Sequence, residues 1–429
     1  MKEFIFFKNK NIELFYSNYI TLEPNPILEL YRCKLFLNIQ QIFITKMLKK
    51  LGKNIFSLKK NYIRTLKNIL SSWIFVQCSK LKNMEVQLFP THDLSFENIK
   101  TTLNDFLKIT IKSQEKRTEL IDDVLTYINL EKLFKERKKL FINYTNSTYY
   151  NTIKNKYKII KQIVNITTNN KIIKYIKYTI KLPFIINEYK LSYIIDNILI
   201  PKDIWLKLKN NFNAQHLNLN DVIWCVLLRY KCLSSHNHQL AVSPIIMNKM
   251  NNDMDLAFEC FASSINNTFT NYCSIFYDLE KWFGSLGSFF GIFPIKGTYG
   301  FNPPYEKIII ERGVNNILKA LQIAKKNNNK LTFILTLPIW DKKGKTLMNN
   351  FSCNKNVIDY GEFSIINKIK SCIYFVGLKM VKKDQFSYLD YNNQYYKDKT
   401  IQNTYIILLS SKPKNETMEY INKYNYYFS

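Results

Sequence analysis

The sequence predicts an α/β protein with a mostly helical region ahead of the α/β part. Apolar residues recur at three- and four-residue spacing before residue 239, and short apolar runs alternate with helical patterns after residue 240. A chain of 429 residues with 46% hydrophobic residues can bury a large core and is expected to form two domains. We therefore expect a helical domain at residues 1–239 and an α/β domain at residues 240–429.

The first domain is expected to consist mainly of helices. Its middle, about residues 144–190, is rich in Lys, Tyr, Ile, Asn and Thr and less regular, which indicates an insertion or mobile loop. The helical patterns run from Pro26 to Lys50, Asn54 to Lys80, Ser95 to Ile111, Thr118 to Lys139 and Leu219 to Cys232.

The second domain is expected to contain a sheet of about six strands, an ordinary size for such folds. Its first strand begins at Leu256 and ends in a run of small polar residues, as a buried parallel strand followed by a tight loop does. A helical pattern from Glu306 towards Lys325 separates two of the strands. The further strands are predicted at Tyr272 to Asp278, Gly297 to Phe301, Leu331 to Pro338, Cys372 to Leu378 and Asn403 to Ser410.

The most informative motif is the tetrapeptide Asn302-Pro303-Pro304-Tyr305, which lies where a strand passes into a helix. This is where α/β folds place ligands. The Asn302 side-chain carbonyl and the Pro303 backbone carbonyl could each accept an N–H of a planar amino group and aim its lone pair at a donor methyl. The prolines fix φ and remove two backbone donors, and a Tyr305 ring can stack on a base for roughly 1–3 kcal/mol.

The tetrapeptide also has a purely structural interpretation. Asn-Pro and Pro-Pro are ordinary turn-forming pairs, and the chain is rich in asparagine. The blocks around the motif favour the functional interpretation. They are residues 222–230, Phe258 to Ser263, Phe283 to Ser285 and Pro338 to Trp340.

In order and spacing, these blocks resemble the cap-specific mRNA adenosine N6-methyltransferases, the phosphorylated CTD-interacting factor family, over about residues 222–410. The resemblance implies a class I S-adenosylmethionine-dependent, Rossmann-like fold beside a helical domain, acting on the adenosine next to the mRNA cap. It gives the tetrapeptide the role of the family's Asn-Pro-Pro-Phe motif. It assigns S-adenosylmethionine binding to Asn302 and to the loop residues Glu259, Cys260, Phe261, Ala262, Ser263 and Asn266.

Three departures from the family pattern stand out. Tyr305 replaces a phenylalanine, and Lys307 stands where the family has an acid, with Glu306 one place early. The Trp-Trp-type peptide-binding module of animal members is not seen, which leaves a tie to the RNA polymerase II tail doubtful. Capped mRNA is the partner that the resemblance implies, and a nuclear location follows from the same resemblance and from the basic charge.

The formal net charge of +29 suits a polyanionic partner, although inflated Lys, Asn, Ile and Tyr contents also fit AT-rich codons. The six arginines are more informative, because a guanidinium binds phosphate with a planar fork. Arg32 and Arg64 lie on helical patterns and are predicted to reach RNA, with a solvated helix face as the alternative. Lys307 is a further candidate RNA contact. Trp340 could stack on substrate or pack on the core.

Other classes of site find little support. The eight cysteines are scattered without a CxxC pair, so we expect free thiols and no metal site. His236 and His238 form a loop pair without a matching ligand cluster, and no Walker loop or G-x-S-x-G elbow is present. We expect no secretory signal and no membrane span.

Three functions stay open from the residues. The first is N6-methylation of adenosine in RNA. The second is methylation of DNA adenine or protein glutamine, since the tetrapeptide suits amine and amide acceptors generally. The third is a catalytically silent RNA-binding relative that keeps the fold as a scaffold.

Overall fold

The computed structural model describes residues 5–8, 22–52, 62–79, 88–91, 94–108, 110–168, 171–233, 239–340, 365–382, 388–391, 398–399 and 403–412. The chain divides into two compact units. Unit 1 comprises Met1–Leu14, Asn237–Ile275 and Ser285–Ser429, and unit 2 comprises Phe15–His236 and Phe276–Gly284. The main change from unit 2 to unit 1 lies between His236 and Asn237, while Met1–Leu14 belongs to unit 1 and Phe276–Gly284 belongs to unit 2.

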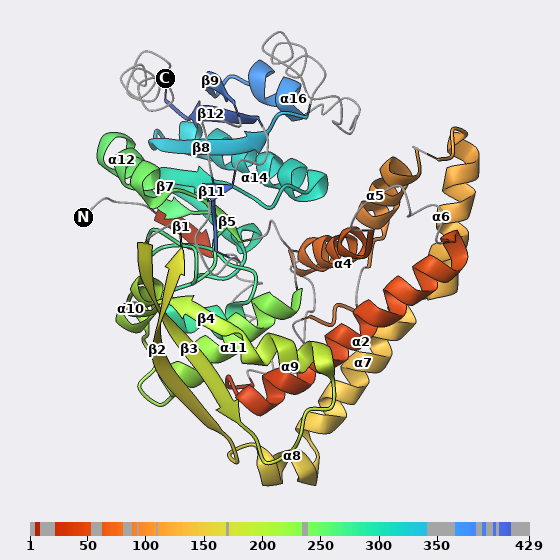
Figure 1. Cartoon of the computed structure of the whole chain (residues 1–429). Helices are drawn as coiled ribbons and strands as arrows, with labels where there is room; N and C mark the ends of the chain where they lie inside the picture. The colour runs from red at the N-terminus through yellow and green to blue at the C-terminus, as the bar shows by residue number, and fades with distance from the viewer. Residues whose placement is uncertain are drawn as a thin grey trace. The chain divides into compact units, whose positions relative to one another are not determined.

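Unit 1 is built on a mixed six-stranded sheet. Strand β7 pairs in parallel with β6 and with β8, whereas β12 lies antiparallel between β8 and β9. Figure 1 shows β7, β8, β12 and β9 side by side in this order. Strand β1 (Ile5–Lys8) pairs antiparallel with the first half of β7. The other strands are β6 (Leu256–Glu259), β7 (Ile292–Phe301), β8 (Leu331–Pro338), β9 (Phe375–Val381) and β12 (Thr404–Ser410).

Helices cover both faces of this sheet. Alternate residues of a strand point to opposite faces, so the contacts of β8 show which helices lie on each face. Phe333 and Leu335 of β8 pack in one cluster with α14 (Lys307–Lys326) and α16 (Ile365–Ser371). Ile334, between them, packs in the other cluster with α12 (Pro244–Met254). Unit 1 is therefore an α/β/α arrangement, as the alternation of patterns predicted.

Unit 1 also contains a second sheet, which has three strands, and one of them directly precedes α12 in the chain. Its order is β11-β10-β5, and β10 pairs antiparallel with both neighbours. The strands are β5 (Leu240–Val242), β10 (Tyr388–Asp390) and β11 (Asp398–Lys399).

Unit 2 is mostly helical, as expected, and its longest helix α2 packs against α6, α7 and α11. The predicted helix at 118–139 is two helices, because Asn129 adopts a left-handed conformation with φ of 52° and caps the second one. The helices are α2 (Pro26–Leu51), α4 (Tyr62–Cys78), α5 (Glu97–Leu107), α6 (Gln114–Ile128), α7 (Leu130–Thr145), α8 (Thr148–Ile153), α9 (Tyr189–Asp196), α10 (Lys202–Asn211) and α11 (Leu219–Leu233).

The segment 144–190, expected to be an insertion or mobile loop, holds a long β-hairpin instead. Strand β2 (Lys158–Thr168) pairs with β3 (Lys171–Lys181) over eleven residues each, and β3 also pairs with β4 (Ile198–Pro201). The two strands read KIIKQIVNITT and KIIKYIKYTIK, which are rich in β-branched residues but do not alternate strictly, so no period-two pattern marked them in the sequence.

The strand predicted at 272–278 is also wrong. Tyr272 makes single bridges to Glu259 and Ser285, and the chain then forms α13 (Tyr277–Glu280). Asp278 and Glu280 bond to Arg229 and Tyr230 of α11, which draws this short segment into unit 2. Within the described residues, no helix is both long and apolar enough to span a membrane.

Candidate functional site

The tetrapeptide lies directly after β7 and before α14, as the sequence predicted. Phe301, the last residue of β7, is fully buried and anchors the turn against the helix that follows. The Pro304 carbonyl accepts from the Glu306 N–H at 2.7 Å, which closes the turn. Among the described residues, neither the Asn302 side chain nor the Pro303 carbonyl has a hydrogen-bond partner. Both acceptors thus make no hydrogen bond within the described residues, and the Asn302 side chain also lines the pocket described below.

Tyr305 is fixed by two other aromatic residues. Its ring meets Trp340 edge-on at a centroid distance of 6.2 Å and Tyr388 at 6.3 Å. Its hydroxyl hydrogen-bonds to that of Tyr388, which lies 3.5 Å from Thr404 Oγ1. Burial raises the pKa of Tyr305 well above its ordinary value and that of Tyr388 to about 12, so both phenols stay protonated near neutral pH.

Trp340 adjoins the tetrapeptide, as its place after β8 suggested, but it is only 9% exposed. The structure therefore favours the packing role among the two that the sequence left open. A ring buried to this extent offers little area on which a base could stack.

The loop after β6 is held by its own backbone and side chains. Glu259 Oε2 accepts from the backbone N–H groups of Thr268 and Phe269 at 2.7 and 2.9 Å. Ser263 N donates to Asn266 Oδ1 at 2.7 Å, and the Asn266 N–H returns to Ser263. These bonds fix the direction of the Glu259 carboxylate and of the Asn266 amide without a glycine-rich turn.

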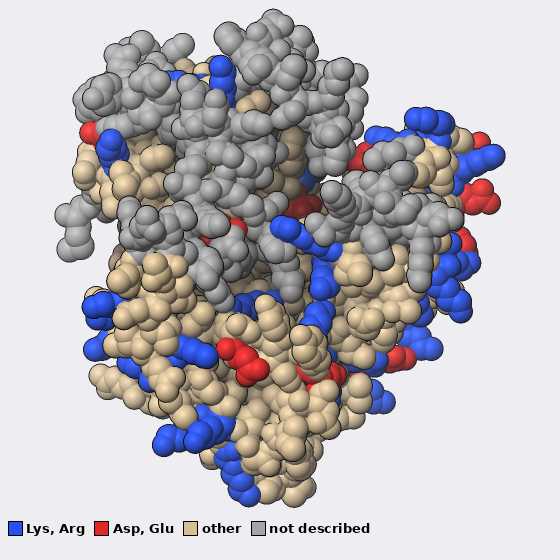
Figure 2. Space-filling view, viewed as in Figure 1, with Lys and Arg blue, Asp and Glu red and all other residues tan. Residues whose placement is uncertain are grey.

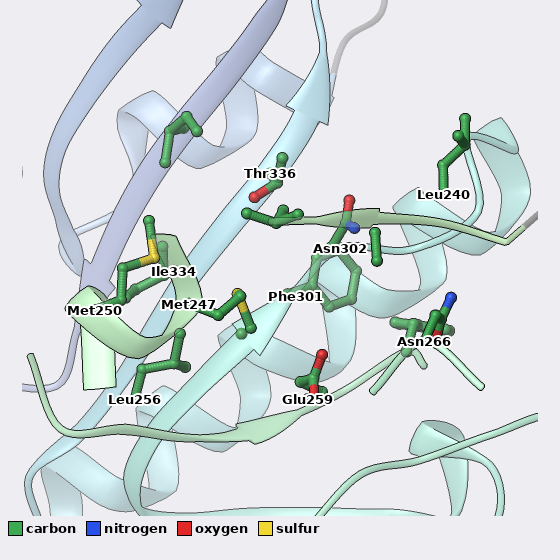
Figure 3. Close-up of a pocket in the computed structure, with 15 residues that line it drawn as sticks. Leu240, Met247, Met250, Leu256, Glu259, Asn266, Phe301, Asn302, Ile334 and Thr336 are labelled. Atoms are coloured by element: carbon green, nitrogen blue, oxygen red, sulfur yellow. The ribbon is translucent and has the colours of Figure 1, made fainter. Parts of the chain in front are cut away.

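A narrow pocket lies between the ends of β6 and β7, with a volume of about 30 Å³. Figure 3 shows Met247, Met250, Leu256 and Ile334 towards one end, and Glu259, Asn266 and Asn302 towards the other. The carboxyl ends of neighbouring parallel strands meet here, as at other ligand sites of α/β sheets. The full lining is Leu240, Ala241, Val242, Met247, Met250, Leu256, Glu259, Phe261, Asn266, Gly300, Phe301, Asn302, Ile334, Thr336 and Ile406.

The pocket unites four of the predicted cofactor residues: Glu259, Phe261, Asn266 and Asn302. The other three, Cys260, Ala262 and Ser263, do not line it. Burial raises the pKa of the Cys260 thiol well above its ordinary value, which makes it a packing residue rather than a nucleophile. Sequence reasoning missed Thr336 and the methionines of α12, since nothing local marks a residue that reaches the site across the sheet.

These side chains offer a carboxylate, two amides and apolar surface, which suit the hydroxyl and amino groups and the apolar parts of a nucleoside-type methyl donor. A volume of about 30 Å³ admits roughly one water molecule. Binding of a nucleoside therefore requires side chains of the pocket to move apart.

The predicted RNA contacts lie in different settings. Arg32 is 5% exposed, its guanidinium donates to Glu29 at 2.9 Å and to Asp278 at 3.3 Å, and it lies over the Phe141 ring. Arg32 is therefore a core ion pair of unit 2, and its prediction as an RNA contact is wrong. The helix pattern was right, but it could not tell which face would be covered.

Arg64 and Lys307 are exposed, so both stay open as RNA contacts. Lys307 lies 3.9 Å from Glu311, one turn along α14. On the face shown in Figure 2, Lys and Arg side chains are spread over many elements, with Asp and Glu between them, and do not gather in a single patch. The net charge alone therefore does not locate a binding surface.

Comparisons with known proteins agree with the motif. A family model described as "Phosphorylated CTD interacting factor 1 WW domain" matches residues 202–362, which include the tetrapeptide. Over 124 residues the chain is 29% identical to the mRNA (2'-O-methyladenosine-N(6)-)-methyltransferase of Mus musculus and 28% identical to that of Homo sapiens. Each match covers 28% of this chain and 17% of the relative's length. The resemblance of this chain to the phosphorylated CTD-interacting factor family of cap-specific mRNA methyltransferases is thus confirmed.

Proposed function

We propose that the protein transfers a methyl group from S-adenosylmethionine to N6 of adenosine in RNA, and specifically of the cap-adjacent adenosine of mRNA. The observation that carries this proposal is the pair of open acceptors at Asn302 and Pro303, beside a pocket that Asn302 shares with Glu259. The names of the similar mouse and human proteins support the same substrate.

The proposed chemistry follows from the acceptors. The two N–H bonds of the adenine amino group point to the Asn302 side-chain oxygen and the Pro303 carbonyl, which turns the nitrogen lone pair away from the ring. S-adenosylmethionine, when bound, supplies an electrophilic methyl group. The nitrogen forms a bond to that carbon as its bond to sulfur breaks, and one amino proton then passes to water, so no strong base is required.

Glu259, Phe261 and Asn266 are the residues that we propose to hold the methyl donor. We further propose that unit 1 is a class I methyltransferase fold. This assignment is supported by the four mutually parallel strands β6, β7, β8 and β9, with β12 inserted antiparallel before the edge strand β9; β1 is the second antiparallel strand of the sheet. The carboxyl ends of β6 and β7 would then carry donor and acceptor side by side.

Capped mRNA is the proposed partner, with unit 2 and the exposed Arg64 and Lys307 as contacts. The description of the matching family model names a WW domain, and a tie to the polymerase II tail stays a proposal of the same kind. So does residence in the nucleus.

Incubation of the purified chain with a labelled donor and short RNAs tests the proposal. We expect methylation of a capped oligomer with adenosine at the first position and much poorer methylation of uncapped or internal adenosine. Asn302→Ala should lower turnover at least about 100-fold through lost orientation, with the fold retained. Asn252→Ala, at an exposed position of α12 outside the pocket, is the matched control and should leave turnover unchanged.

Two results would contradict the proposal. Methylation of DNA or of protein glutamine in preference to RNA would favour the second function class. Donor binding without turnover on any RNA would favour a silent RNA-binding relative.

A further inference from the structure

A second hollow lies in unit 2, along α7 and the loop before α5. Its volume is about 330 Å³, within the range of sites that bind small ligands. We call it the α7 hollow. Its lining residues are Thr91, Lys135, Lys138, Lys139, Ile142 and Asn143.

The helical repeat explains why these side chains converge. Residues 135, 138, 139, 142 and 143 follow each other at three- and four-residue spacing, so they form one stripe along α7. The stripe is about 12 Å long, since each residue adds about 1.5 Å. Leu133, Phe134 and Phe141 are buried in the core. The stripe therefore presents three ammonium groups to the hollow, while the core-facing residues hold the helix in place.

One of the lysines is built into the wall. Lys138 is only 8% exposed, and its Nζ donates to Thr91 Oγ1 at 3.1 Å. The hydrogen bond to Thr91 and the small exposed fraction hold this ammonium group at a fixed place in the wall of the hollow. Lys135, by contrast, is 58% exposed and pairs with Glu131 at 2.6 Å, an exposed pair that a stronger anion can replace.

The donor set defines the ligand. Three ammonium groups, a hydroxyl and an amide face the hollow, and none of the six lining residues is acidic. Phosphate oxygens only accept hydrogen bonds and carry negative charge, so they match this set. A concave basic surface also concentrates the attractive field. The length of the stripe suits an extended chain of phosphates better than a single ion.

We propose that the α7 hollow binds the phosphodiester backbone of an RNA strand. This inference rests on the proposed function, because it takes RNA as the substrate. It adds a sequence-independent contact in unit 2 to the adenosine contact at the tetrapeptide, and it gives the helical unit a part in holding the substrate.

The test uses the full chain and a fluorescent single-stranded RNA, with affinity measured by anisotropy over a salt series. Lys135→Gln with Lys139→Gln removes two exposed charges without disturbing the core. The slope of log affinity against log salt should shrink by about 1.4, since each phosphate contact contributes roughly 0.7. Affinity at 0.1 M salt should then fall about 25-fold. The matched control, Lys112→Gln with Lys116→Gln, changes two exposed lysines of the same unit outside the hollow and should leave slope and affinity close to wild type.

Three outcomes would overturn the inference. The first is wild-type affinity in the Lys135/Lys139 variant, and the second is an equal loss in the control pair. The third is inorganic tripolyphosphate binding as tightly as RNA without a gain from longer RNA, which would make free polyphosphate the ligand. Asn302→Ala, which should lose methyl transfer, is expected to keep the salt dependence of the wild type, so the two claims are tested separately. A wild-type chain that transfers no methyl group but shows the salt effect would contradict the proposed function alone.

Discussion

Tyr305 shows what a single hydroxyl contributes at the residue scale. The family pattern has phenylalanine at this position, and the extra oxygen hydrogen-bonds to Tyr388, a residue of β10 that lies 83 positions later in the chain. Tyr388 in turn approaches Thr404 on β12. The Tyr305 hydroxyl thus links the tetrapeptide to both sheets of unit 1. Stacking of the ring on a base would not require this hydroxyl.

Tyr305→Phe should therefore affect stability more than chemistry. Loss of one buried hydrogen bond should lower the free energy of unfolding by about 1 kcal/mol, as measured by urea denaturation. Turnover should fall less than about tenfold, because the ring that packs beside Asn302 is kept. Tyr149→Phe, at a 57% exposed position, is the control and should change neither quantity. A loss of turnover as large as that of Asn302→Ala would instead give the hydroxyl a direct role in the reaction.

At the scale of elements, Gly313 decides how closely α14 can approach β7. A Cβ atom at this position would lie 2.5 Å from Cε2 of the Phe301 ring, which is fully buried. The absence of a side chain therefore lets the helix press on the residue that directly precedes Asn302. The contact between Gly313 and the Phe301 ring therefore influences the distance between α14 and the end of β7, where the tetrapeptide begins.

Gly313→Ala should lower the free energy of unfolding by about 1–3 kcal/mol through overpacking, even though alanine favours a helix by roughly 1 kcal/mol. Gln322→Ala, on the exposed side of α14, should change it little. In a double-mutant cycle, Phe301→Leu should relieve part of the cost of Gly313→Ala, since the two residues are in contact. Additive effects of the two changes would contradict the proposed clash.

At the scale of the whole molecule, unit 2 is joined by a buried ion-pair network. Arg229, with no exposed surface, donates to Glu29 at 2.6 and 2.8 Å and to Asp278 at 2.7 and 2.8 Å. Burial lowers the pKa of Arg229, but the two carboxylates more than offset this and raise it above its ordinary value. The network therefore joins α2, α11 and α13 through side chains of opposite charge.

Arg229→Met should cost about 3–5 kcal/mol of unfolding free energy, because it removes one of the two arginines that compensate the buried carboxylates of Glu29 and Asp278. Arg137→Met is the comparison, because the partners of Arg137, Asn38 at 2.8 and 3.0 Å and Glu136 at 3.8 Å, are exposed, and its loss should cost less than about 1 kcal/mol. Thermal and urea unfolding of both variants measures the difference. Equal costs would show that the network adds no more than a surface pair does.

Elements with a clear apolar period were predictable from sequence. Strand β8 begins and ends where the pattern predicted, and α2 and α11 agree within one residue. Asn129 escaped prediction, because the periodicity continues through it while a left-handed backbone divides the helix. The segment at 272–278 failed for another reason: its apolar side chains are buried by packing of a turn and a short helix, which an apolar run alone cannot distinguish from a strand.

The sequence by itself determined the α/β alternation, the position of the Asn302 tetrapeptide between a strand and a helix, and the resemblance to cap-specific methyltransferases. These properties are encoded in neighbouring residues, where propensity, periodicity and turn chemistry act. Only the tertiary structure decided that β12 lies antiparallel between β8 and β9, that Arg32 is buried, and that Tyr305 meets Tyr388. Each of these depends on a pairing between residues far apart in the chain, and such pairings are fixed by which faces can be buried together rather than by any local pattern.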